Sequence, residues 1–317
     1  MASVSDLGLL CADVYEFRAK GPGSRVPGTT GAVWERVENY GPDGNPLDAP
    51  TRWWWERGFF AALYRRVDTG EHVLAIRGTD SKLDWLTSNA TLSAGFTPDQ
   101  YRPARFAWAW ASGLARGEFM VTGHSLGGGL AFMLSGEFGS PAVTFNAPHM
   151  LSVRPSQSRL ASVYRTVREF SHFLSTQTRP GRWNRADGSR MIHVRTTDDV
   201  VSSPRVWRLA SRLFWLGLDA LPGEQWTLNA ATGGAVPPQF PEVPLTGDPE
   251  LDDAASNAAL AVYAMRRAKY HLSCHVMDTI NNAICALPPA ERARYLCDPP
   301  WARCRHSARL PPQRSCP

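Results

Sequence analysis

The stretch Glu118–Leu134, EFMVTGHSLGGGLAFML, decides the fold. Its first five residues form a short apolar run that predicts a buried strand, and the residues from Leu126 onward predict a helix. Between them, Gly123 to Gly127 reads G-H-S-L-G, a G-x-S-x-G pattern in the strand–turn–helix setting that a nucleophile elbow requires. The glycines are needed because a Cβ in so tight a turn would strike the neighbouring strand or helix. We therefore expect the Ser125 hydroxyl at the top of a sheet, beside a helix N-terminus.

Strand and helix candidates alternate on both sides of this stretch, which predicts an α/β fold whose sheet is mostly parallel, with helices on both faces. An amphipathic helix capped by Ser3 or Ser5 is expected first, followed by a loop rich in glycine and proline from Gly21 to Gly31. The strand candidates are Val33–Glu38, Gly58–Val67, His72–Ile76, Ala142–Phe145, Met191–Thr196 and an edge strand at Glu224–Asn229; the helix candidates are Ser5–Phe17, Asp99–Leu114, Ser152–His172 and much of Asp252–Ile284.

Charge and hydropathy exclude two classes of function. The net charge of +5 comes from 34 basic and 29 acidic residues, but no basic run is interleaved with aromatic residues, so a nucleic-acid partner is not expected. No apolar stretch approaches the twenty or so residues of a membrane span. The first residues also lack the pattern of a cleavable signal peptide, because Met1 to Phe17 carries three acidic residues.

The six cysteines are unevenly distributed along the chain. Cys11 stands alone, whereas the other five lie between Cys274 and Cys316. Their gaps match no common zinc site, so disulfides and reduced thiols both fit, and disulfides are favoured. We expect a catalytic domain over residues 1–287, an irregular tail rich in cysteine, proline and arginine over 288–317, and neither a metal nor an organic cofactor.

A serine hydroxyl needs a base within hydrogen-bond reach and an acid that orients the base. On sheets with this elbow the order along the chain is serine, acid, histidine. The acid candidates are Asp198 and Asp199, directly after a predicted strand; Asp199 is preferred, since it precedes an apolar pair and Asp198 can cap the turn. For the base, His275 lies at the boundary before a new helical run, and His271 is the fallback.

The negative charge that forms on the carbonyl oxygen of a substrate needs two preorganised donors. The backbone N–H of Leu126, the residue after the nucleophile, is one. The second is expected from the loop after the strand His72–Ile76, where the backbone N–H of Thr79 ends the sequence Arg77-Gly78-Thr79.

Two apolar segments allow two interpretations each. Val206–Leu218, VWRLASRLFWLGL, predicts a strongly amphipathic helix that either packs in the core or forms a lid over the site. The tryptophan triplet from Trp53 to Trp55 fits packing on both sides of an edge strand better than insertion into lipid.

Four segments carry a family resemblance: LAIRGTDSKLDWL, VTGHSLGGGLA, AVTFNAP and RTTDDVVSSP, within Gly58 to Pro204. Together they resemble the lipase class 3 family of α/β-hydrolases, whose best-known members are fungal triacylglycerol lipases. The resemblance implies an α/β-hydrolase fold with Ser125 as nucleophile, Asp199 as acid, Thr79 and Leu126 as oxyanion donors, and Asp84-Trp85 in the loop beneath a lid. The sequence H-V-M-D at His275 is similar to H-S-M-D in some bacterial relatives. The cysteine-rich tail and the tryptophan triplet depart from the family pattern.

The predicted function is that of a serine carboxylic-ester hydrolase acting on lipid or phospholipid at a membrane or micelle surface, as a lipase or phospholipase A. An esterase for small or plant-wall esters and a non-catalytic binding module are the alternatives. The missing signal and clustered cysteines also suggest a bacterial effector, exported by a specialised secretion system with its carrier into the envelope or periplasm of a target cell and matched by an immunity protein. A cytoplasmic lipase is the other location considered.

Overall fold

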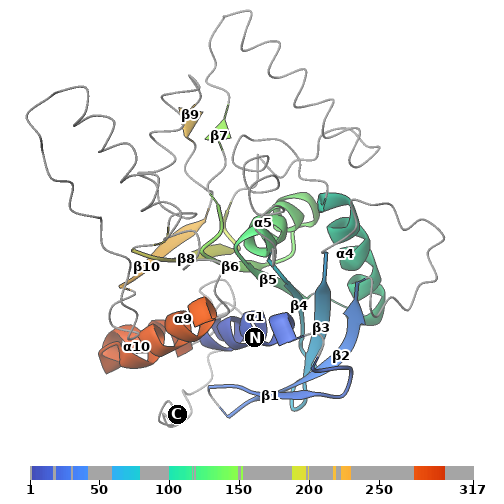
Figure 1. The fold of residues 1–317 in the computed structure, drawn as a ribbon, viewed down its shortest axis with the longest axis horizontal. Helices are drawn as coiled ribbons and strands as arrows, with labels where there is room; N and C mark the ends of the chain where they lie inside the picture. Colours follow the sequence, from blue (N-terminus) through green and yellow to red (C-terminus); the bar gives the residue numbers. More distant parts are fainter. Residues whose placement is uncertain are drawn as a thin grey trace, which may run out of the picture.

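The fold is built around one large sheet, seen in a computed structural model of the chain (Figure 1). The strand order is β1-β2-β3-β4-β5-β6-β8-β10. Strands β4, β5, β6, β8 and β10 are parallel, and β1 to β4 are joined by antiparallel pairing. The structure describes residues 2–16, 19–29, 31–41, 59–78, 100–115, 117, 119–148, 151–152, 188–197, 199, 217–218, 223–229 and 275–296.

The strands follow the apolar runs of the sequence closely. Three of them have the predicted bounds, because each is a continuous buried run closed by turn residues: β4 (His72–Ile76), β6 (Ala142–Phe145) and β8 (Met191–Thr196). The elbow strand starts two residues later than predicted. The remaining strands of this sheet are β1 (Arg25–Pro27), β2 (Val33–Tyr40), β3 (Ala61–Arg66), β5 (Met120–His124) and the edge strand β10 (Glu224–Leu228).

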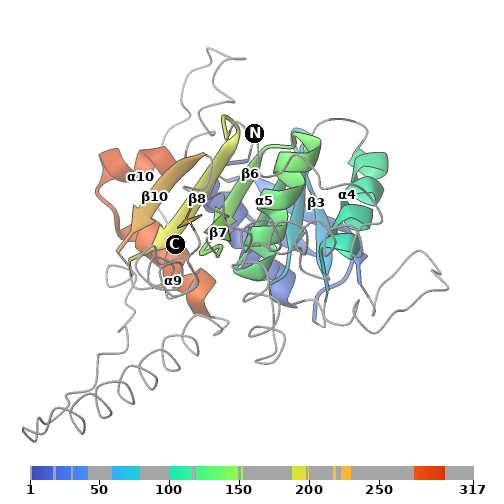
Figure 2. The same cartoon turned by 90° about the horizontal axis from the view of Figure 1, so that it is seen from above.

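Helices cover both faces of the sheet, as predicted, and each face has its own core (Figure 1). On one face lie α4 (Tyr101–Ala115) and α5 (Leu126–Phe138). On the other lie α1 (Val4–Asp13), with its 3-10 extension η1 (Val14–Glu16), α9 (His275–Ala286) and α10 (Pro289–Leu296). Figure 2 places α9 and α10 at the β8–β10 end of the sheet and α4 at the β3 end.

Two predictions for the N-terminal region are corrected. The first helix begins as expected, with the Ser3 side chain accepting the Asp6 N–H at 3.0 Å. Its polar face is not exposed to solvent, however, because the helix lies between the sheet and α9 and buries Ser5, Asp6 and Asp13 together with its apolar residues. The expected loop Gly21–Gly31 contains the short strand β1, which extends the sheet at its antiparallel edge.

The prediction of an irregular tail from Pro288 is wrong for its first part, which forms α10. Proline suits the first position of a helix, since its missing N–H would have no intrahelical partner there. Tyr295 of α10 is buried, with its ring 5.0 Å from the Trp226 ring, and Arg294 pairs with Glu224 at 2.9 Å. The domain boundary at 287/288 stays a prediction.

Four further expectations meet the described residues only in part or not at all. Leu151–Ser152 (β7) pairs with Gly217–Leu218 (β9), so Ser152 and the end of the segment Val206–Leu218 are strands and not helix. The rest of both segments, the tryptophan triplet and Cys274, Cys297, Cys304 and Cys316 lie outside the described residues. Cys11 is a buried free thiol, so it takes no part in a disulfide.

The sheet order, the helices on both faces and a serine at the turn between β5 and α5 establish the predicted α/β-hydrolase fold. Within the described part of the chain, no helix is both long and apolar enough to cross a membrane.

Candidate active site

Ser125 occupies the turn between β5 and α5 with a backbone conformation that L-residues rarely adopt. Its φ is 57° and its ψ is −129°. A non-glycine residue in such a region costs about 1–3 kcal/mol, and this strain is typical of functional positions. The turn is held from both sides, because the Ser125 N–H donates to Phe145 O at 2.9 Å and its carbonyl accepts the Gly129 N–H at 3.1 Å. The side chain is buried, with 1% of its surface exposed.

The glycines beside the serine are required by close backbone approach, as predicted. A Cβ at Gly123 would lie 2.4 Å from Gly127 C and O, and a Cβ at Gly127 would lie 2.2 Å from Ile76 O. Both distances are far below a van der Waals contact. The first turn of α5 therefore packs directly on the ends of β4 and β5, and only glycine allows this approach.

Of the two predicted oxyanion donors, the structure describes Leu126 but not Thr79. Leu126 is the first residue of α5 and is fully buried, so its N–H belongs to the positive end of that helix. Thr79 lies outside the described residues, but Gly78 directly before it is described. A Cβ at Gly78 would lie 3.1 Å from Ser125 Cβ and 2.6 Å from His124 O. The end of β4 thus approaches the elbow closely, which is the neighbourhood that the prediction for Thr79 requires.

The predicted acid lies at the same edge of the sheet. Asp199 follows β8 and is 2% exposed, and its N–H donates to Thr196 O at 3.4 Å. Strands β5 and β8 are parallel and both neighbour β6, so their carboxyl ends are about 10 Å apart. Asp199 as the acid partner of Ser125 stays a prediction. The competing candidate, Asp198, lies outside the described residues.

His275, the predicted base, is the first residue of α9. Helix α9 leads into α10, whose Arg294 pairs with Glu224, the first residue of β10. The assignment of His275 as the base stays a prediction. The fallback, His271, lies outside the described residues, and so does the Asp84-Trp85 pair.

Two residues at this edge have no counterpart in the sequence-based prediction. Asn146 follows β6 with φ 46°, and its side-chain oxygen accepts the Thr196 N–H at 2.8 Å, which joins the ends of β6 and β8 ahead of Asp199. Tyr15 of η1 places its hydroxyl 2.9 Å from His124 Nδ1 and 3.1 Å from Gly78 N. The segment N-A-P marks Asn146 only as a strand tip, and a single tyrosine after a helix gives no signal of its partners.

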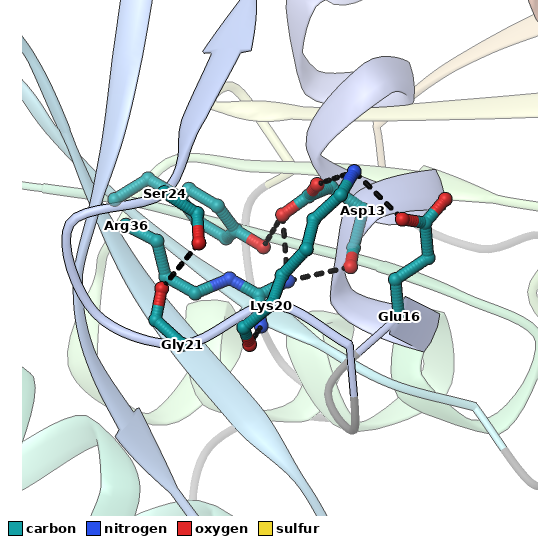
Figure 3. Close-up of polar contacts among 7 residues, drawn as sticks. Asp13, Glu16, Lys20, Gly21, Ser24 and Arg36 are labelled. Carbon is teal, nitrogen blue, oxygen red and sulfur yellow. Dashed lines mark hydrogen bonds and ion pairs between the residues drawn. The ribbon is translucent and has the colours of Figure 1, made fainter.

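A buried charge cluster supports η1 (Figure 3). The Asp13 carboxylate accepts hydrogen bonds from Arg36 at 2.6 Å, Tyr64 at 2.8 Å and Lys20 at 2.8 Å. Burial alone would raise the pKa of Asp13, but the Lys20 hydrogen bond and the Arg36 charge bring that pKa below its ordinary value. Lys20 also pairs with Glu16 at 2.7 Å. The buried contacts of Asp13 therefore fix the chain directly before η1, whereas the Lys20–Glu16 pair is largely exposed and adds little.

The described residues hold no cluster of three or more histidine, cysteine or carboxylate side chains that could bind a metal ion.

Part of the chain is similar to a family of known proteins. Residues 7–156 match the Tle-like phospholipase domain of the phospholipase-like family. The matched segment contains Tyr15, Gly78 and the elbow. This match confirms the predicted kinship with lipases and phospholipases, and it ends before Asp199 and His275.

The extracellular phospholipase A1 of Serratia liquefaciens is 33% identical over 141 residues, which is 44% of this chain and 40% of that protein. The chain therefore matches less than half the length of this relative. Among solved structures, a mutant form of MDLA from Penicillium cyclopium is 13% identical, with a TM-score of 0.42 over 77% of this chain and 83% of that chain. Lip2 lipase from Yarrowia lipolytica is 15% identical, with a TM-score of 0.37 over 75% and 80% of the two chains.

Proposed function

We propose that this protein is a serine carboxylic-ester hydrolase that acts on lipids, as a phospholipase A or a lipase. The strained, non-glycine conformation of Ser125 at the head of α5 carries the proposal, because such strain persists only where the surrounding structure enforces it. The match of residues 7–156 to a phospholipase domain supports a lipid ester as substrate.

In the proposed mechanism, Ser125 Oγ attacks the ester carbonyl carbon while His275 takes the serine proton. The C=O bond opens, and the oxyanion accepts hydrogen bonds from the backbone N–H groups of Leu126 and Thr79. His275 then returns the proton to the leaving alcohol as the ester C–O bond breaks, and the acyl group stays on Ser125. Asp199 orients the imidazole and stabilises its positive charge. Water repeats the sequence and releases the fatty acid.

The oxyanion donors are expected to supply much of the rate. Removing one such donor raises the barrier by about 3 kcal/mol, roughly a hundredfold in rate. The position of Leu126 at a helix N-terminus and the close approach of Gly78 to the elbow support this part of the proposal.

A phospholipid is the preferred substrate over a triacylglycerol, because both the matched family and the bacterial relative are described as phospholipases. Two alternatives remain from the sequence: an esterase for small or plant-wall esters, and a binding module without turnover. The strained serine argues against the second, since a binding module gains nothing from that strain.

We further propose that the protein works outside the cell that makes it. The relative from Serratia liquefaciens is described as extracellular, which supports export. An effector delivered into another cell's envelope by a secretion-system carrier would need an immunity protein in the producer. Expression directed to the periplasm of a test bacterium should then be harmful, whereas expression in its cytoplasm or of Ser125→Ala in the periplasm should be tolerated. Equal tolerance at both locations would refute delivery to the envelope.

The enzymatic proposal is tested by fatty-acid release from phospholipid vesicles and from triacylglycerol emulsions, with the intact protein beside Ser125→Ala. Release from vesicles that disappears in the mutant is expected. Release from the emulsion alone would make the protein a triacylglycerol lipase, and hydrolysis of short soluble esters alone would favour the esterase. Release that survives in Ser125→Ala would refute the serine mechanism.

A further inference from the structure

The Tyr15 hydroxyl joins two parts of the site that are far apart in sequence. It lies 2.9 Å from Nδ1 of His124, the residue before the nucleophile, and it accepts the N–H of Gly78 at 3.1 Å. The two partners are 109 and 63 residues away from Tyr15 along the chain. One oxygen atom thus holds the elbow and the end of β4 at a fixed separation.

The chemistry of these contacts fits a tyrosine and excludes an apolar substitute. The Gly78 N–H can only donate, so the hydroxyl oxygen is its acceptor, and the hydroxyl hydrogen remains available for the imidazole nitrogen. A buried N–H that loses its acceptor is costly, so Gly78 is expected to shift if the hydroxyl is removed. The space around Gly78 is tight, because a Cβ there would lie 2.5 Å from the Tyr15 oxygen.

Tyr15 is itself held in place. Its ring meets the His124 ring edge to face, with 6.0 Å between the ring centres. The residues that flank it in sequence belong to the charge cluster of Figure 3, in which Asp13 binds Arg36 and Glu16 binds Lys20. The hydroxyl is therefore presented by a short helix whose start is anchored by the buried Asp13–Arg36 pair.

We propose that Tyr15 is a positioning residue that sets the oxyanion hole of this enzyme. Gly78 directly precedes Thr79, and His124 directly precedes Ser125, so the Tyr15 hydroxyl fixes one donor loop relative to the nucleophile. This inference rests on the proposed serine mechanism but not on the identity of the lipid. It assigns to η1 a part in catalysis without contact between Tyr15 and the reacting atoms.

The test is the rate at which a fluorophosphonate reacts with Ser125, in the intact protein and in Tyr15→Phe. This reaction places negative charge on a phosphoryl oxygen, so it depends on the same donors and needs no lipid substrate. The rate constant at saturating reagent should fall about tenfold or more in Tyr15→Phe, with little change in the concentration that gives half saturation. A residue that only stabilises the fold would lower the amount of active protein and leave that rate constant unchanged.

Tyr101→Phe is the matched control. The Tyr101 hydroxyl is also buried and hydrogen-bonded, to Met133 O and to the Glu137 carboxylate, but these lie about 12 and about 18 Å along α5 from the serine. Tyr101→Phe should lose stability and keep the labelling rate constant of the intact protein.

The outcomes separate the inference from the proposed function. If the intact protein is not labelled at Ser125, the serine mechanism fails and this inference fails with it. If the intact protein is labelled and Tyr15→Phe has the same rate constant, only the inference is overturned. An equal loss in Tyr101→Phe would also overturn it, because the effect would then follow stability.

Discussion

Replacing Arg36 by methionine is expected to lower the free energy of unfolding by about 3–5 kcal/mol, the range found when one partner of a buried ion pair is removed. The Arg36 side chain is fully buried and donates to three oxygens: Asp13 Oδ2 and Asp13 O, each at 2.6 Å, and Lys20 O at 2.7 Å. Methionine keeps the apolar stem and supplies no donor. Lys20 and Tyr64 still bind the carboxylate, which argues against a cost above this range.

Arg65→Met provides the matched control on the neighbouring strand. Arg65 pairs with Glu35 at 2.8 Å, but half of its side chain is exposed, so its ion pair is worth no more than about 1 kcal/mol. Urea unfolding at neutral pH measures both variants against the intact protein through the midpoint and the slope of the transition. If Arg36→Met costs no more than Arg65→Met, the cluster does not anchor η1 as argued.

Three further outcomes are expected. The pKa of Asp13 is lowered in the folded protein, so its contribution to stability is present above its ordinary pKa of 3.8 and is lost as the pH falls through the folded value. The difference in unfolding free energy between the intact protein and Asp13→Asn should therefore shrink from about pH 5 to about pH 2. A constant difference would contradict the lowered pKa. Burial raises the pKa of Cys11 to about 12, opposed in part by its hydrogen bond with Thr122. Iodoacetamide at mild alkaline pH should therefore modify Cys11 roughly a thousandfold more slowly in the folded than in the unfolded protein, as measured by peptide mass spectrometry. Equal rates would refute its burial. Gly127→Ala should lower the melting temperature far more than Gly139→Ala, because a Cβ at Gly127 meets Ile76 O. Gly139, at the other end of α5, has a left-handed backbone conformation but open space around it, so its substitution costs only about 1 kcal/mol. Equal shifts would count against the close packing of the elbow.

The sheet could be predicted from the sequence where burial is simple. The strands β4, β6 and β8 are short runs rich in apolar and β-branched residues and closed by turn residues, so their bounds follow from the local sequence. The elbow could be predicted because G-x-S-x-G has a steric cause, which the close approach of Gly123 to Gly127 makes explicit.

The parts that could not be predicted depend on partners distant in sequence. The periodicity of α1 indicates an apolar face. It does not show that the Asp6 carboxylate accepts hydrogen bonds from the N–H and hydroxyl of Thr29, or that the Asp13 carboxylate accepts one from Arg36. These hydrogen bonds allow the polar face of the helix to be buried. The richness of residues 288–317 in cysteine, proline and arginine predicted an irregular tail, although Pro289 starts a helix. The proposed role of Tyr15 rests on contacts of η1 with Gly78 and with the elbow, which no local sequence pattern indicates.

The central claim, that Ser125 is the nucleophile, is tested most directly by mapping a fluorophosphonate adduct and following the activity that remains. The account predicts one phosphonyl group per chain, on Ser125, and loss of fatty-acid release from phospholipid vesicles in proportion to labelling. An adduct on a different residue, or fatty-acid release that continues in fully labelled protein, would contradict it.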